Sequence, residues 1–435
     1  MSSQKNELTV CICGKPCGRL EEDRHGALSF TYDANYEGVP LSLSMPVSLA
    51  SYGNGIVRPY LMGLLPDDET TRAQIGASYG VSGDNPFRPL RIIGLDCPGA
   101  VQVCPHGTCP PLEDSERDLA ELSESDIALH LADVRENAAS AWVGNAGIMG
   151  HWSLGGCQAK LALRLHENRW FACTGAAATT HILKPGVTGL GEQALVEYLS
   201  MRTAHAIGLP AAAVEYRMFG SETVVIVTRY DRIRHDDGSI SRIHQEDLCQ
   251  ALSVQPTAKY AEQGGPTTPQ IISLLRATGK NARENVYQFI LYLFFNYLIG
   301  ATDAHAKNHS IVFVDSDDIR LAPLYDVASI APYRSLRPQQ RKPLRAALSI
   351  GGENRFGLVG ASHVSKLTQT CDLESLDLNA EMLCDRFQTM ARMIPEALDR
   401  EITEAEKREL IGIEKVAPIL SSEIRANCAR TLALL

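Results

Sequence analysis

Three polar residues in the C-terminal half have the types and the spacing of a phosphoryl-transfer site. Asp303 and Asn308 stand five residues apart, and Asp326 follows after a strand-like run at 310–314. In protein kinases the catalytic-loop Asp accepts the proton of the acceptor hydroxyl, while an Asn five residues later and a further Asp hold magnesium. We therefore predict Asp303 as the catalytic base and Asn308 and Asp326 as metal ligands. Asp and Asn are common in loops and helix caps, so this pair needs support from its surroundings.

A predicted core helix precedes this cluster. Residues 289–299 are almost continuously apolar, but the run is shorter than the roughly 20 residues that span a bilayer. A buried helix that ends directly before the Asp303 loop would hold the loop rigidly, as a catalytic site requires.

A glycine-rich turn supplies a candidate cover for the phosphates. The run S-L-G-G-C-Q-A-K at 153–160 contains Gly155 and Gly156 directly before a predicted strand. Paired glycines let backbone N–H groups approach an anion closely. The run is neither a Walker A loop nor G-x-G-x-x-G, and an ordinary hairpin turn is the alternative.

A kinase also needs a lysine for the phosphates and an acidic residue that positions this lysine. Lys184 ends a predicted strand, and Glu197 lies on the predicted helix that follows, so the two side chains can pair. The alternative for Lys184 is a solvated charge. We expect the hinge between two lobes near 242–250, where the backbone of Glu246 and Leu248 would meet adenine.

The coarse pattern of elements predicts an α+β fold with two lobes. Residues 1–110 are rich in short strands and turns, 111–127 form an acidic linker or loop, and the chain reads as helical from 246 onward. The central segment carries predicted strands at 161–165, 170–172, 181–184 and 223–228 and a predicted helix at 193–207. We therefore divide the chain at 1–110, 111–245 and 246–435, and we expect the last segment to be an all-helical lobe.

Composition narrows the classes of function. The net charge of -10 argues against a chain that binds nucleic acid by itself. A basic run, Arg334 to Arg345, is either a solvated loop or a contact for a substrate or partner.

The start of the chain lacks an apolar stretch behind its charge, so we expect a cytoplasmic protein. The 12 cysteines lack zinc spacing and favour buried, reduced thiols, with a metal site as the alternative.

The assembled motifs resemble the HipA family of bacterial type II toxin serine/threonine kinases. The kinase part resembles it at S-L-G-G-C-Q-A-K (153–160), T-H-I-L-K-P (180–185), R-Y-D-R (229–232), H-Q-E-D-L-C-Q (244–250), T-D-A-H-A-K-N (302–308) and L-Y-D-V-A-S (324–329). The first segment resembles the small N-terminal subdomain of the family at L-S-L-S-M-P (41–46), G-L-L-P-D (63–67) and G-L-D-C-P-G-A-V (94–101). The match covers most of the chain.

The resemblance implies a two-lobed protein-kinase-like fold and a serine/threonine kinase that uses ATP and Mg²⁺. It implies that Ser153, Lys160, His305 and Lys307 join Gly155, Gly156, Lys184 and Glu197 in the ATP site, and that Ser153 is autophosphorylated. It also implies a HipB-like helix-turn-helix antitoxin, DNA contact only through that antitoxin, no membrane, and growth arrest or persistence. An aminoacyl-tRNA synthetase, such as glutamyl-tRNA synthetase, would be the protein substrate.

Three departures from the family pattern affect substrate choice more than phosphoryl transfer. They are Ala301, Ala304 and His309, and none of them removes a charged ligand. Two alternatives remain open at this point. One is a pseudokinase or co-repressor scaffold that acts with a DNA-binding antitoxin, and the other is a small-molecule kinase on a related fold.

Overall fold

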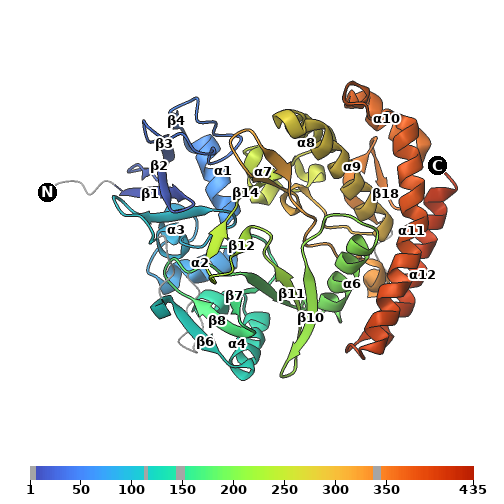
Figure 1. Ribbon diagram of the computed structural model, residues 1–435, viewed down its shortest axis with the longest axis horizontal. Helices are drawn as coiled ribbons and strands as arrows, with labels where there is room; N and C mark the ends of the chain where they lie inside the picture. Colours follow the sequence, from blue (N-terminus) through green and yellow to red (C-terminus); the bar gives the residue numbers. More distant parts are fainter. Residues whose placement is uncertain (1–5, 112–115, 144–151, 337–343) are drawn as a thin grey trace.

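The computed structural model describes residues 6–111, 116–143, 152–336 and 344–435. Sheets and helices are both present, which confirms the predicted α+β class, and the described residues form three adjoining parts (Figure 1). We call them the N-terminal part (6–111), the middle part (116–242) and the C-terminal part (244–435). The domain boundaries drawn from the sequence stay a prediction.

The N-terminal part is a five-stranded antiparallel sheet packed against three helices. Its strand order is β4-β3-β2-β1-β5. The strands are β1 (Asn6–Ile12), β2 (Lys15–Glu22), β3 (Leu28–Tyr32), β4 (Ser51–Tyr52) and β5 (Val101–Pro105), and the helices are α1 (Asn54–Leu64), α2 (Glu69–Ser78) and α3 (Phe87–Ile93). Alternate residues of β3, Leu28, Phe30 and Tyr32, are buried, as expected for a strand with one face on a core.

The middle part is a six-stranded sheet covered on both faces. Its order is β10-β11-β9-β7-β8-β6. The strands are β6 (Leu119–Leu122), β7 (Leu161–His166), β8 (Arg169–Cys173), β9 (His181–Pro185), β10 (Val214–Phe219) and β11 (Glu222–Thr228). The four strands predicted from the sequence are confirmed as β7, β8, β9 and β11.

Strand β11 shows how this sheet packs on two sides. Val224 and Ile226 join the core beneath α4 (Glu124–Glu136), whereas Val225 and Val227 join the core that includes α6 (Gln193–Ala206). The predicted helix is thus confirmed as α6, which lies between the sheet and α11 (Ala380–Lys407). The short elements of this part are η1 (Glu116–Asp118), α5 (Ser140–Val143) and the hairpin β12 (Arg232–Arg234) and β13 (Ile240–Arg242).

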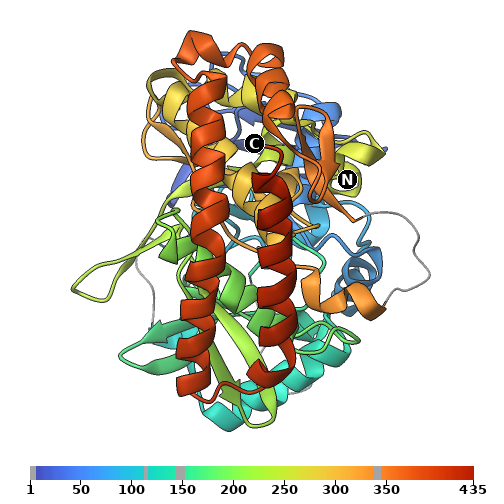
Figure 2. The ribbon, with the colours of Figure 1, turned by 90° about the vertical axis from the view of Figure 1, so that its right-hand side faces the viewer.

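The C-terminal part is organised around α9 (Ala282–Ile299), which is apolar on all sides and buried, as predicted. Around it lie α7 (Leu248–Ala251), α8 (Thr268–Arg276), α10 (Ala361–Thr370), α11 and α12 (Ile413–Leu432). The last two run side by side as a long pair on the outer surface (Figure 2). Phe294 of α9 stacks on Phe387 of α11, with ring centroids 4.1 Å apart. Short 3-10 turns link these elements: η2 (Pro256–Ala258), η3 (Ala261–Gln263), η4 (Gly279–Asn281), η5 (Ala306–Asn308), η6 (Ala331–Leu336) and η7 (Leu373–Leu376).

The prediction that this part is all-helical is wrong. It contains a three-stranded sheet, β14 (His244–Asp247), β15 (Ser310–Phe313) and β16 (Ile319–Leu321), and a hairpin, β17 (Arg345–Ile350) and β18 (Glu353–Arg355). β14 pairs with β15 from far along the chain, so local sequence carries little signal for it.

In the described ranges no helix is both long and apolar enough to cross a membrane. Part of the basic run of the sequence, 337–343, lies outside the described residues.

Candidate active site

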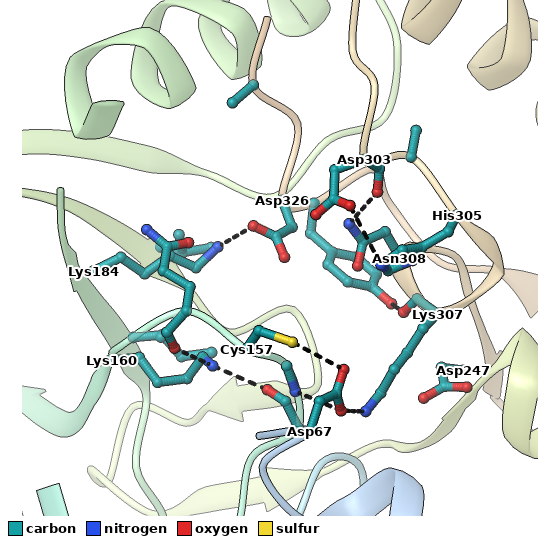
Figure 3. Close-up of a pocket in the computed structure, with 18 of the residues that line it drawn as sticks. Asp67, Cys157, Lys160, Lys184, Asp247, Asp303, His305, Lys307, Asn308 and Asp326 are labelled. Atoms are coloured by element: carbon teal, nitrogen blue, oxygen red, sulfur yellow. Dashed lines mark hydrogen bonds and ion pairs between the residues drawn. The ribbon is translucent and has the colours of Figure 1, made fainter. Parts of the chain in front are cut away.

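A cavity of about 630 Å³ lies where the three parts meet. Small-molecule sites have volumes of roughly 300–1,000 Å³, so a nucleotide is within its capacity. The N-terminal part contributes Asp67, the middle part Gly155 and Lys184, and the C-terminal part Asp303 and Asp326. Figure 3 shows the side chains of Asp67, Lys184, Asp303 and Asp326 around one space.

Lys184 is held at the end of β9 by two carboxylates. Its Nζ donates to Glu197 Oε1 on α6 at 2.8 Å and to Asp326 Oδ1 at 2.7 Å. Burial works against the charge on Lys184, but Asp326 and Glu197 together raise its pKa above the ordinary value. The lysine is therefore a fixed cation inside the cavity, and it lies close to one of the predicted metal ligands.

The loop between α9 and η5 carries the acidic and amide groups that the sequence placed there. Helix α9 ends at Gly300, whose φ of 76° reverses the chain. The side-chain Nδ2 of Asn308 donates to the backbone O of Asp303 at 2.9 Å. This hydrogen bond leaves the amide oxygen of Asn308 free to face a ligand.

The donor set fits a magnesium ion. Asp326 offers a carboxylate and Asn308 an amide oxygen to the same cavity, and Mg²⁺ is commonly bound by one or two carboxylates together with substrate phosphates. The backbone φ of Asp326 is +58°. Asp is one of the few non-glycine residues that readily adopt this left-handed conformation.

Asp303 is the most open of the acidic groups. Its side chain is 64% exposed toward the cavity, and the hydroxyl of Tyr260 donates to its Oδ1. Burial within the cavity walls raises the pKa of Asp303, while the hydrogen bond from Tyr260 acts in the opposite direction. Nearby His305 is 2% exposed and its ring nitrogens have no hydrogen-bond partner among the described residues. Burial lowers the pKa of His305 to about 3, so its ring is neutral.

The carboxylate of Asp67 lies beside the glycine-rich turn, in a position that suits an anion. Lys307 forms an ion pair with Asp67, and Lys259 Nζ lies 3.0 Å from Asp67 Oδ2. The backbone N of Gly156 and the thiol of Cys157 also donate to this carboxylate, at 3.3 and 3.7 Å. The two lysines lower the pKa of Asp67 against the effect of burial. Two cations and a backbone amide around one carboxylate form the kind of cradle that binds a phosphate.

Lys160 fastens the same turn from within. Its Nζ donates to the carbonyl oxygens of Gly155 and Gln158 at 3.0 and 2.7 Å. Burial, together with the charge of Lys184, lowers the pKa of Lys160 to about 8. A Cβ on Gly155 would lie 2.6 Å from the backbone O of Gly63 and 2.8 Å from Lys307 Nζ, so only glycine fits there.

Ser153 lies on the opposite side of this turn from the cavity. Its side chain is fully buried, and its Oγ donates to the backbone O of Leu64 at 2.6 Å. The hydroxyl is therefore not among the groups that line the cavity. This differs from our expectation that Ser153 lies near the phosphates, and the reason is that the N-terminal part supplies a hydrogen-bond acceptor that local sequence does not reveal.

The predicted adenine hinge residues, Glu246 and Leu248, are not among the residues that line the cavity. Both residues are buried away from the cavity, and Glu246 Oε1 accepts from the backbone N of Leu43 at 2.7 Å. Their neighbours Gln245 and Asp247 line the cavity instead, because successive residues of a strand point to opposite faces. Residues 228–230, at the end of β11 and just after it, also line the cavity.

Sequence reasoning missed three further residues of the site. Asp67 belongs to a motif that was noticed only for its family resemblance, and Lys259 and Tyr260 precede a Gly-Gly-Pro turn that carried no assignment. A basic–aromatic pair before such a turn is the only local signal that could have found them.

Comparisons with known proteins found two matching family models and related kinases. The HipA N-terminal domain model matches residues 8–104, and the HipA-like C-terminal domain model matches residues 152–398. A putative kinase, Y4mE, of Sinorhizobium fredii is 36% identical over 340 residues, which cover 76% of this chain and 79% of that protein. The serine/threonine-protein kinase toxin HipA of Shewanella oneidensis is 28% identical over 388 residues, covering 86% of this chain and 83% of that protein.

A solved structure shares the fold over nearly the whole chain. It is Shewanella oneidensis HipA in a complex with HipB and operator DNA, with a TM-score of 0.79, 24% identity and coverage of 98% of both chains.

Proposed function

Because this chain belongs to the HipA family and is a kinase, we propose that it transfers the γ-phosphate of ATP to a serine or threonine of a protein. The observation that carries the proposal is the convergence of Asp303, Asn308 and Asp326 with the Lys184–Glu197 pair on one cavity. A site with this set of charges serves phosphoryl transfer mainly by positioning and by neutralising charge.

Each residue has a role that follows from its contacts. Asp303, open to the cavity, accepts the proton of the acceptor hydroxyl. Asn308 and Asp326 would hold Mg²⁺, which when bound neutralises charge on the phosphate oxygens. Lys184 meets the phosphates as a cation fixed by Glu197. The adenine would lie against residues 228–230, which line the cavity.

We further propose that this kinase is the toxin of a toxin–antitoxin module in the cytoplasm. The likeness to a HipA solved with HipB and operator DNA supports a HipB-like antitoxin as partner, with DNA contacted through it. A translation-related protein, such as an aminoacyl-tRNA synthetase of the glutamyl-tRNA synthetase type, is the proposed substrate, and its modification would arrest growth and favour persistence. The scaffold alternative is disfavoured because no charged group of the catalytic set is missing.

An assay with labelled ATP tests the central claim. Wild-type protein with Mg²⁺ should label a protein in a cell extract, and Asp303→Asn should lose about 10²- to 10⁴-fold in rate. Asp317→Asn is the matched control, since Asp317 is 77% exposed in the β15–β16 turn. Equal labelling by wild type and Asp303→Asn would refute the assignment, and labelling of a sugar or amino acid in place of protein would favour a small-molecule kinase.

Autophosphorylation of Ser153 is part of the proposal. The buried hydroxyl must leave the carbonyl of Leu64 before it can meet any phosphate, so the turn at 153–160 has to open. A phosphate adds about -1.5 to -2 charges at neutral pH, which cannot return to a fully buried position. The turn would then stay open and the enzyme would be switched off.

Mass spectrometry after incubation with ATP and Mg²⁺ tests this step. Phosphate is expected on the peptide that contains Ser153, together with loss of activity. Thr174, whose Oγ1 likewise donates to a backbone carbonyl, that of Asp118 at 3.3 Å, provides a comparison hydroxyl that should stay unmodified. Full activity with Ser153 phosphorylated, or no phosphate there at all, would contradict the switch.

A further inference from the structure

Two neighbouring residues, Lys259 and Tyr260, contact opposite sides of the cavity. Lys259 Nζ lies 3.0 Å from Asp67 Oδ2, on the side of the glycine-rich turn. The hydroxyl of Tyr260 donates to Asp303 Oδ1, on the catalytic side. We call residues 256–265, which carry both side chains, the strap.

The strap is a closed turn rather than a loose loop. The backbone N atoms of Gln263 and Gly265 both donate to the backbone O of Tyr260 at 2.9 Å. Gly264 has a φ of +85°, and a Cβ on Gly265 would lie 2.0 Å from the backbone O of Ala258. The backbone at Tyr260 is therefore fixed by its own turn before any side-chain contact is counted.

The Tyr260 ring is fixed as well. It packs edge-on against the ring of His305, with centroids 4.9 Å apart. His305 itself is 2% exposed, so it cannot turn away without repacking. The phenol hydroxyl consequently reaches Asp303 from a rigid support.

This arrangement leaves room for a substrate. The contacts of the Asp303 carboxylate with Tyr260 and with His305, the latter at 3.8 Å, both involve Oδ1. The Asp303 side chain is 64% exposed, so an acceptor hydroxyl can approach Oδ2 while Tyr260 stays in place. If Tyr260 were a plug in the acceptor position, the carboxylate beneath it would be covered.

We propose that Tyr260 is a positioning residue for phosphoryl transfer, which orients the Asp303 carboxylate toward the acceptor hydroxyl, and that Lys259 couples this orientation to the glycine-rich turn through Asp67. The inference rests on the proposed kinase function. Donation of a hydrogen bond to a carboxylate stabilises its ionised form, which is the form that accepts a proton.

Tyr260→Phe is the decisive variant because it removes the hydroxyl and keeps the ring on His305. The rate constant kcat should fall about 10- to 100-fold, with the KM for ATP within about twofold of wild type. Tyr216→Phe is the control: its hydroxyl donates to the backbone O of Ile411 at 3.1 Å, outside the cavity.

A second measurement needs no nucleotide. Melting temperatures of wild type, Tyr260→Phe, Asp303→Ala and the double variant form a cycle that isolates the coupling of the two residues. Non-additive shifts are expected, whereas additive shifts would overturn the contact. The cycle tests the contact even if the wild type transfers no phosphate, a result that would refute the proposed function and not the contact.

Three other results would overturn the proposal. Faster turnover in Tyr260→Phe would make the phenol an obstacle to the acceptor. An unchanged kcat would remove any role for the phenol in transfer. Phosphate on Tyr260 after incubation with ATP and Mg²⁺ would make it an acceptor instead of a support.

Discussion

At the scale of single residues, Asp326 takes part in two interactions of the site. It pairs with Lys184, and it is a proposed ligand of the metal. Its carboxylate accepts from Lys184 at 2.7 Å and faces the cavity shared with Asn308. Its left-handed backbone, with φ of +58°, costs on the order of 1–3 kcal/mol in a non-glycine residue. The surrounding contacts hold it there, so the carboxylate is presented where a metal and a lysine can both meet it.

Replacing Asp326 should weaken nucleotide binding and leave the fold intact. We expect Asp326→Ala to lose ATP-dependent transfer and to weaken Mg²⁺-dependent binding of a non-hydrolysable ATP analogue by at least about tenfold, since a metal ligand is removed. Calorimetric titration with and without Mg²⁺ measures this, with circular dichroism as the check on folding and Asp317→Ala as the control. A folded variant that turns over like wild type would rule out the metal-ligand role.

Glu246 provides a pH-dependent prediction. Burial raises the pKa of its carboxyl from the ordinary 4.5 to about 8, and Oε2 has no hydrogen-bond partner among the described residues. Between those two pH values the folded state binds a proton that the unfolded state has lost. The contribution of Glu246 to stability is therefore complete below pH 4.5 and is lost as the pH rises through 8.

Glu246→Gln removes this titration and keeps the shape. The free energy of unfolding of wild type, relative to Glu246→Gln, should decrease from pH 5 to pH 8 by at most about 1.4 kcal/mol per pH unit. Urea unfolding at several pH values measures the difference between the two proteins. A difference that stays constant across this range would show that Glu246 is not protonated in the folded state.

At the scale of elements, a buried ionic cluster joins the loop before β5 to the chain after β11. Arg232 Nη2 lies 2.8 Å from Asp96 Oδ1, and Arg229 Nη2 lies 2.8 Å from Asp231 Oδ2. Each of these side chains is at most 3% exposed. Arg229 is also in the 228–230 segment that lines the cavity, so the cluster ties this segment to the N-terminal part.

Breaking the cluster should cost stability well beyond that of a surface pair. Asp96→Ala leaves the guanidinium groups of Arg229 and Arg232 buried without this partner, which should destabilise the protein by about 3–5 kcal/mol. Glu121→Ala breaks the exposed pair with Arg169, 3.1 Å apart, and should cost less than about 1 kcal/mol. Denaturant unfolding of both variants gives the comparison, and equal costs would contradict a structural role for the cluster.

At the scale of the whole molecule, the cavity depends on all three parts at once. Asp67 comes from the N-terminal part, Lys184 from the middle part, and Lys259 and Asp303 from the C-terminal part. The ion pairs of Asp67 with Lys259 and Lys307 join residues that are 192 and 240 positions apart in the chain. The glycine-rich turn and the loop that carries Asp303 are thus connected through the packing of the parts.

Growth of cells tests the proposed role of the intact protein. Expression without an antitoxin should slow growth, and Asp303→Ala should relieve the effect, because arrest requires phosphoryl transfer. Matched strains with equal protein levels are compared, and Asp317→Ala should remain as toxic as wild type. Equal toxicity of the Asp303→Ala form would mean that any arrest is not catalytic.

Features of the fold and of the site that depend on neighbours along the chain could be predicted from the sequence. The apolar run of α9 and the spacing of Asp303, Asn308 and Asp326 are local patterns, and the strands β7, β8, β9 and β11 follow from short runs of apolar residues. Lys184 and Glu197 are paired because one strand and the next helix carry them. The order of these elements was sufficient to indicate a kinase site.

Features that depend on contacts between distant segments could not be predicted from the sequence and became visible in the folded chain. β14 pairs with β15 from more than 60 residues away, and the period-two register of β14 turns Glu246 away from the cavity and Gln245 toward it. Asp67 reaches Lys259 and Lys307 only after the N-terminal part has packed on the others. Secondary-structure propensity depends on residues that are close together in the chain, so it does not describe such pairings. Their free energy comes from burial and from charges that meet only in the folded chain.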